Sequence, residues 1–124
     1  MGRVAIAAVL TNTEGIILEV NPAYERVTGR CRGELVGQKP GINSAGTTVR
    51  PTYEDLWNTL QQGQVWEGAL ENRRPDGSFW WAHELIIPIR LGERVAGYWA
   101  MIAEDSESTA RTLPDTAEKT SQTL

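Results

Sequence analysis

The chain has 124 residues, enough for one compact domain with a modest hydrophobic core. Its net charge of −4 comes mostly from residues 104–124, and the other 11 acidic and 10 basic side chains nearly cancel, so no basic surface is predicted. The apolar run at residues 4–10 is too short for a membrane span or a signal peptide, and the lone cysteine, Cys31, fits a reducing cytoplasm. We therefore expect a cytoplasmic domain that binds no nucleic acid and has no direct membrane insertion.

The first part of the chain gives strand signals followed by a helix signal. Residues 4–10 and 16–20 are rich in Val, Ile and Leu and predict two strands joined by a short turn. Asn21 is a good helix N-cap and Pro22 is a favoured first helical residue. Together they predict a helix that ends near Gly29.

Helical patterns continue through the middle of the chain. Residues 32–37 predict a short helical turn, and residues 40–45 are expected to be irregular. The strongest helix is predicted at residues 50–62, with Gly63 after its end. Four side chains within it recur at the i, i+3, i+4 and i+7 spacing of one helical face: Tyr53, Leu56, Trp57 and Leu60.

A long β-hairpin with unusual aromatic content follows. Residues 66–73 and 78–87 alternate like strands around the turn sequence Pro75-Asp76-Gly77, and residues 94–103 predict a final strand. Three of the five tryptophans lie on this hairpin: Trp66, Trp80 and Trp81. Because exposing that much indole to water is costly, we expect the hairpin to line a cavity, to meet a partner, or to do both on opposite faces.

This order of elements predicts the fold class. Two strands, short helices and three further strands indicate an α+β fold, a five-stranded antiparallel sheet with short helices packed on one face. We expect the folded unit to span residues 3–105. Residues 106–124 contain no aromatic side chain and are rich in Thr, Ser, Glu and Ala, which predicts a polar flexible tail or linker.

Several short motifs occur in an order and spacing that resemble the PAS sensor family. They are Gly15-Ile-Ile-Leu-Glu-Val-Asn-Pro-Ala-Tyr24, Thr28-Gly29, Glu34-Leu-Val-Gly37 and the hairpin pattern from Trp66-x-Gly68 through Asn72-Arg-Arg to Pro88. The resemblance covers roughly residues 3–105 and implies the PAS fold. Within the family, the segment from Asn43 to Arg74 is similar to the FAD-binding redox and oxygen sensors of bacterial aerotaxis receptors and nitrogen-fixation redox regulators.

The resemblance also bears on other PAS cofactors. Light-oxygen-voltage domains use a flavin-reactive cysteine, but the aligned position here is Pro40 and Cys31 lies upstream, so no photoadduct is expected. Haem-binding PAS domains supply a histidine from the long helix, whereas the only histidine here is His83, expected on the outer surface of a strand. Cys31 and His83 have no metal-site spacing, so neither haem nor a metal site is predicted.

Strand alternation and the resemblance sort the second hairpin strand into two faces. Trp80 and Glu84 are expected to point inward, where Trp80 either fills the core or lines a pocket. An inward Glu84 needs a polar partner such as a ligand, unless a twist lets it reach solvent. On the outer face, Trp81 and Leu85, with Tyr98 nearby, are expected to form a docking or dimer contact, or else Trp81 is an isolated surface residue.

The resemblance implies a set of flavin contacts. Asn72 would satisfy one edge of the isoalloxazine ring, unless it marks a β-bulge, and Trp57 either fills the core or also touches the cofactor. Arg50 is expected to be the charge partner of the phosphate, whereas Arg73 and Arg74 are expected on a solvated strand edge. The predicted cofactor contacts are Asn43, Ser44, Thr47, Arg50, Trp57, Trp66, Asn72, Trp80 and Glu84.

We therefore predict a PAS sensor domain that binds FAD and reports redox state or oxygen to a downstream signalling domain or protein. It is expected to form a homodimer through the outer sheet face. No nucleophile–base pair and no pair of catalytic carboxylates emerges from the sequence, so we expect no catalytic residues and no enzyme activity. Two alternatives stay open, a cofactor-free interaction module filled by the same tryptophans and a sensor of a small metabolite.

Overall fold

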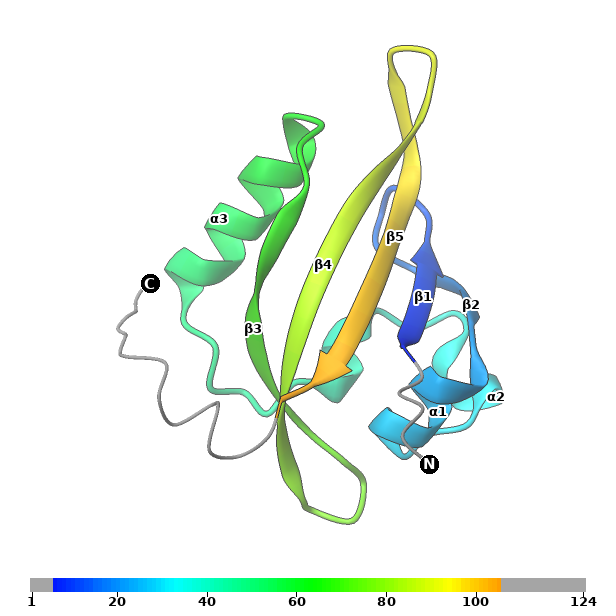
Figure 1. Cartoon of the computed structure of the whole chain (residues 1–124), viewed down its shortest axis with the longest axis vertical. Helices are drawn as coiled ribbons and strands as arrows, with labels where there is room; N and C mark the ends of the chain where they lie inside the picture. The colour runs from blue at the N-terminus through cyan, green and yellow to red at the C-terminus, as the bar shows by residue number, and fades with distance from the viewer. Residues whose placement is uncertain (1–5, 106–124) are drawn as a thin grey trace.

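The computed structural model describes residues 6–105, which form an α+β domain (Figure 1). The helices of this range lie on one face of its sheet, so the predicted fold class is confirmed. Residues 1–5, and the tail predicted for residues 106–124, lie outside the described range. Within residues 6–105, no helix combines the length and the apolar character needed to cross a membrane.

The described strands form one antiparallel sheet with the order β2-β1-β5-β4-β3. In chain order they are β1 (Ala7–Thr11), β2 (Ile17–Val20), β3 (Trp66–Arg73), β4 (Phe79–Leu91) and β5 (Arg94–Glu104). The chain leaves the sheet at the β2 edge and returns at the opposite edge as β3. The helical segment between these strands therefore crosses the sheet and covers its inner face.

The crossing segment contains four short helical elements: α1 (Pro22–Thr28), α2 (Arg32–Leu35), the 3₁₀ turn η1 (Pro40–Asn43) and α3 (Arg50–Gln61). Asn21 caps α1 as predicted, because its Oδ1 accepts a hydrogen bond from the Tyr24 amide at 2.9 Å. The same oxygen accepts from the Ala8 amide at 2.9 Å, which ties the start of α1 to β1. The segment expected to be irregular at residues 40–45 thus begins with a 3₁₀ turn.

Strand β4 extends further than its sequence pattern indicates, because Pro88 does not interrupt it. Pro88 has no amide hydrogen to donate to a neighbouring strand. The pairing of β3 with β4 ends at Trp66 and Ile86, before Pro88, so no hydrogen bond to β3 is lost. On its other side, β4 stays paired with β5 as far as Leu91. The prediction that this strand ends at residue 87 is therefore too short by four residues.

The hydrophobic core has two parts on the inner face of the sheet. In the first, Tyr24 of α1 and Leu35 of α2 pack with side chains of β1, β2, β4 and β5. In the second, Leu56 and Leu60 of α3 pack with Trp66 and Tyr98. Members of both parts line the cavity described next.

Candidate functional site

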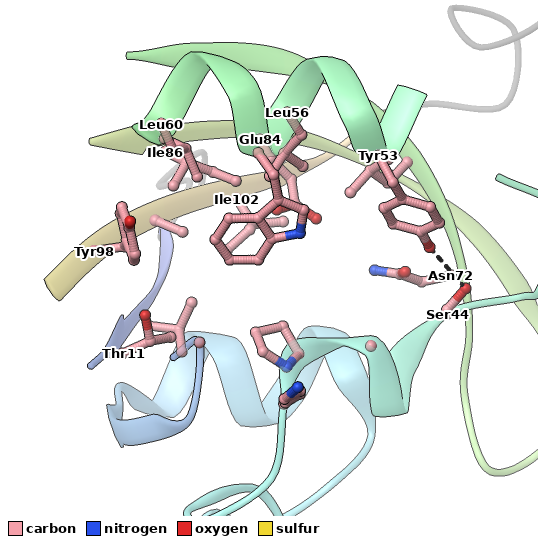
Figure 2. Close-up of a pocket in the computed structure, with 18 of the residues that line it drawn as sticks. Thr11, Ser44, Tyr53, Leu56, Leu60, Asn72, Glu84, Ile86, Tyr98 and Ile102 are labelled. Carbon is pink, nitrogen blue, oxygen red and sulfur yellow. Dashed lines mark hydrogen bonds between the residues drawn. The ribbon is translucent and has the colours of Figure 1, made fainter. Parts of the chain in front are cut away.

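A cavity of about 350 Å³ lies between the inner sheet face, α3 and the loop that carries η1 (Figure 2). Strands β1, β3, β4 and β5 form its floor, and residues 14–15 and 39–41 also contribute to its wall. The volume falls at the lower end of the range of roughly 300–1,000 Å³ that is typical of small-molecule sites. The cavity is therefore large enough to hold a ring-sized ligand.

Helix α3 presents its predicted apolar face to the cavity. The four side chains of that face all line the wall: Tyr53, Leu56, Trp57 and Leu60. Leu56 and Leu60 are buried, whereas Trp57 keeps 39% of its surface exposed. The Trp57 ring packs edge-on against Tyr98 of β5, with 5.9 Å between ring centroids. The 3.6-residue periodicity thus identified one wall of the site from the sequence.

Asn72 on β3 is held at the point where the crossing segment passes the sheet edge. Its backbone forms an isolated bridge with Ser44. The amide orientation that satisfies both of its polar atoms is the reverse of the one drawn in Figure 2, and in it Nδ2 donates to the backbone carbonyls of Asn43 and Glu71, each at 3.2 Å. Asn72 lines the cavity, and this amide orientation leaves Oδ1 as an acceptor for a ligand. Ser44 also contacts Tyr53, with 3.4 Å between the hydroxyl oxygens (Figure 2).

Glu84 of β4 places a carboxyl group on the cavity wall. Burial raises the pKa of Glu84 to about 7, and the neighbouring charge of His83 only partly opposes this increase. No hydrogen bond or ion pair to the Glu84 carboxyl occurs within residues 6–105. The carboxyl group is therefore available to a ligand, and at neutral pH it is close to its titration point.

A buried polar pair lies next to Glu84. The Nδ2 of Asn43 donates to the Tyr24 hydroxyl at 3.2 Å, and both residues are almost fully buried. Burial, followed by the negative charge of Glu84, raises the pKa of Tyr24 well above its usual value. Tyr24 lines the cavity, and Asn43 supports it from behind. The Oδ1 of Asn43 has no hydrogen-bond partner in the described part of the chain.

Trp80 lines the cavity and is only 4% exposed. The Arg74 guanidinium lies 5.2 Å from its ring centroid, and the indole Nε1 has no hydrogen-bond partner among residues 6–105. Arg74 also donates to the Val27 carbonyl at 2.8 Å and pairs with Glu104 at 2.9 Å. The prediction that Arg74 belongs to a solvated strand edge is therefore wrong, because these contacts hold it against the core.

The structure brings five of the nine predicted cofactor contacts to the cavity: Ser44, Trp57, Asn72, Trp80 and Glu84. It does not bring the other four there. Asn43 lies behind Tyr24, and Thr47 donates to Glu71 at 2.8 Å on the outside of the crossing segment. Arg50 is exposed at the start of α3, and the Trp66 Nε1 donates to Asp55 at 3.0 Å within the core beside the cavity.

The outer sheet face differs from the prediction at one aromatic position. Trp81 and Leu85 lie outside, as expected, but Tyr98 is 8% exposed and lines the cavity. Tyr98 pairs with the buried Pro88, and directly paired residues share a face. The outward assignment of Tyr98 is therefore wrong, and its neighbour Trp99, which is 39% exposed, lies on the outer face instead.

Other cavity residues escaped the sequence analysis. Tyr24 carries no distinguishing signal in a short helix, and Gly15 and Lys39 reach the wall from loops without periodicity. Pro40, considered in the sequence only as the position of an absent cysteine, also lines the cavity. Loop residues of this kind are positioned by tertiary contacts, so no local pattern could have identified them.

An antiparallel sheet with helices over one face and a cavity between the two layers defines an α+β domain with an internal cavity. The family model described as "PAS domain" matches residues 5–107. The chain belongs to the PAS domain family.

Comparisons with individual proteins give the same family. The nitrogen fixation regulatory protein of Klebsiella oxytoca is 34% identical over 87 residues, which is 70% of this chain. The aerotaxis receptor of Escherichia coli K12 is 26% identical over 91 residues, which is 73% of this chain. The aligned part covers only 18% of the length of either relative.

Solved structures show the same fold. A LOV domain from a blue-light activated histidine kinase of Erythrobacter litoralis has a TM-score of 0.77 and 21% identity, over 85% of this chain and 100% of that one. The LOV domain of Aureochrome1 in its light state has a TM-score of 0.80 and 18% identity, over 90% of each chain. At these identities the comparison supports the fold alone.

Proposed function

We propose that this PAS domain binds FAD in its cavity and reports redox state or oxygen to a downstream signalling partner in the cytoplasm, without turning over a substrate. The observation that carries the proposal is the composition of the cavity wall. Apolar and aromatic side chains form most of it, while Asn72 and Glu84 place an amide oxygen and a carboxyl group within it. This arrangement fits a flat aromatic ring with polar edges, such as isoalloxazine.

The residues that line the cavity would make different contacts with the proposed flavin. Leu56, Ile86 and Trp57 would contact the faces of the ring, and Asn72 Oδ1 would accept a hydrogen bond from one edge. Glu84 would hold or release a proton close to neutral pH. When bound, the flavin supplies the redox chemistry, and the protein supplies binding, orientation and electrostatic tuning. Asn72 or Glu84 would have to change its hydrogen-bond partner if the protonation of the bound ring changed.

The size of the cavity bears on the choice of flavin. About 350 Å³ can enclose the ring system but not a whole dinucleotide. The ribityl, phosphate and adenosine parts would extend past the exposed residues Glu14 and Lys39 at the cavity wall. Since Thr47 and Arg50 lie away from the cavity, they do not support the phosphate assignment made from the sequence. The proposal of FAD therefore rests on the resemblance to FAD-binding PAS domains.

The outer face of the sheet supports the proposed homodimer. Trp81 and Leu85 of β4 and Trp99 of β5 all lie on this face, and Trp99 pairs directly with Ile87. Trp99 is 39% exposed and Trp81 and Leu85 are partly exposed, and apolar side chains on one sheet face are typical of protein–protein contacts. A conformational change that begins at the cavity would alter the sheet, and the altered sheet would affect a second copy or a downstream domain bound to its outer face.

The test is the visible absorption spectrum of the whole chain, expressed with excess riboflavin and recorded before and after addition of dithionite. We expect the spectrum of oxidised flavin, its bleaching on reduction, and FAD as the compound released by heat. A colourless protein would contradict the proposal. It would favour a small-metabolite sensor, which the small volume of the cavity also suits.

A further inference from the structure

Three of the five aromatic side chains on the cavity wall differ sharply in their access to solvent and in their surroundings. Trp57, Trp80 and Tyr98 all line the cavity, where the proposed flavin ring would touch them. Trp57 is 39% exposed, whereas Trp80 is 4% and Tyr98 8% exposed. The role inferred for these side chains rests on the proposed flavin in the cavity and on these differences in exposure.

Trp57 connects the cavity to solvent. Its ring packs edge-on against Tyr98 on the inside, and its Cη2 atom lies over the β1–β2 turn, 3.5 Å from where a Cβ on Gly15 would stand. The exposed part of the indole is in contact with water. Water can therefore solvate a positive charge on the exposed part of this ring.

Trp80 has the opposite environment. The Arg74 guanidinium lies 5.2 Å from its ring centroid, so a positive charge on the ring would be repelled in a site with little water to screen it. Its Nε1 has no hydrogen-bond acceptor within residues 6–105, so an oxidised indole at this position would have no group to which it could transfer its proton. Arg74 is fixed there by Val27 and Glu104 and cannot easily move away.

We propose that Trp57 is the electron donor to the light-excited flavin, which gives this domain a light-driven reduction of its cofactor without a cysteine adduct. Trp57 loses one electron from its indole, the flavin takes up that electron, and Nε1 releases its proton to water. A thiol reductant in solution then returns one electron, together with a proton, to the Trp57 radical. The reduced flavin therefore accumulates under light only when both Trp57 and the thiol are present.

The experiment uses the whole chain loaded with flavin, under blue light and without oxygen, in the presence of dithiothreitol. Flavin content is measured first, from the visible spectrum in the dark. Reduction under light is then followed as loss of the oxidised-flavin absorption, and the tryptophan radical is followed by transient absorption. The variants are Trp57→Phe, Trp80→Phe and Trp66→Phe, where Trp66 is a buried core tryptophan that does not line the cavity.

We expect wild type and Trp66→Phe to be reduced under light and to show the radical. Because Trp80 and Trp57 both line the cavity, their variants are compared per molecule of bound flavin. On that basis Trp80→Phe should keep the radical signal, and Trp57→Phe should lose it and fluoresce more brightly. Because Trp57 is partly exposed, this variant should fold even if the two core variants do not, and it decides the question alone. Light reduction and a radical signal that persist in Trp57→Phe overturn this inference only, whereas a wild type without flavin overturns the proposed function as well.

Discussion

Asn72 connects the cavity wall to the segment that crosses the sheet, because its two amide atoms face different groups. Its Nδ2 donates a hydrogen bond to the Asn43 carbonyl, and its Oδ1 can accept a hydrogen bond from a ligand. A ligand group that changes from donor to acceptor would reverse this preference and loosen the contact with Asn43. One side chain could thus link the state of a ligand to the loop around η1.

Replacing Asn72 by Ala should lower flavin occupancy or shift the midpoint potential, because a polar edge of the ring would lose its partner. The expected loss of binding free energy is about 1–3 kcal/mol. His83→Ala serves as the control, since His83 lies on the outer face and contacts Glu67 at 2.7 Å. Flavin content and midpoint potential should be measured for both. Equal values in the two variants would show that Asn72 does not contact the ligand.

Glu84 should make the stability of the ligand-free protein depend on pH. Its pKa is raised from an ordinary 4.5 to about 7 in the folded state, so the folded chain keeps this proton after the unfolded chain has lost it. The contribution is therefore fully present below about pH 4.5 and is lost as the pH rises towards 7. The loss is about 3 kcal/mol of the free energy of unfolding.

Urea unfolding at a series of pH values checks this expectation. Glu84→Gln should unfold with a flatter pH dependence than wild type between pH 4.5 and 7. Glu54→Gln is the matched control, since Glu54 is exposed on α3 and should leave the slope unchanged. If Glu84→Gln and wild type show the same slope, the Glu84 carboxyl is not buried as described.

Among the elements, the end of α1 depends most clearly on a single backbone conformation. Gly29 follows the helix with a φ of +72°, and its amide donates to the Glu25 carbonyl. A Cβ at this position would also lie 3.3 Å from the Pro75 side chain in the β3–β4 turn. Gly29 thus allows α1 to end beside the hairpin that carries Trp80.

Gly29→Ala should therefore lower the free energy of unfolding by about 1–2 kcal/mol, the usual penalty for a left-handed residue with a side chain. Gly33→Ala in α2 is the control, because an added Cβ there meets no atom within 4 Å and helical Ala is favoured over Gly. Denaturant unfolding of both variants gives the comparison. A loss in Gly33→Ala as large as that in Gly29→Ala would contradict the explanation.

At the scale of the whole molecule, the two faces of the sheet have different roles in the proposal. The inner face carries the cavity, and the outer face carries the exposed Trp99 and the partly exposed Trp81 and Leu85. Trp81→Glu and Trp99→Glu should each shift the protein from dimer to monomer while flavin stays bound, because both side chains point away from the cavity. Sedimentation velocity together with the visible spectrum measures both properties.

The control for this prediction is Val49→Glu, which adds the same charge at an exposed apolar position before α3. It should leave the oligomeric state unchanged. A wild type that stays monomeric at high concentration would exclude the proposed dimer. Loss of flavin in Trp81→Glu would instead show that the two faces of β4 are assigned the wrong way round.

The sequence alone determined the elements whose causes are local. The cap at Asn21, the turn at Gly77 and the face of α3 each depend on residues within a few positions of one another, so their patterns could be read directly. Alternation along β4 likewise put Trp80 and Trp81 on opposite faces, and the family resemblance implied that Trp80 is the inner one. The family resemblance then implied the PAS fold.

Only the tertiary structure decided which of the candidate residues meet. Tyr98 faces the cavity because β5 pairs with β4 in a register that sets it opposite Pro88, and that register depends on strands far apart in the chain. Thr47 and Arg50 lie outside because the crossing segment is fastened to β3 through Glu71, a contact that no local pattern encodes. The raised pKa of Glu84 has the same origin, since burial depends on how the layers pack around it.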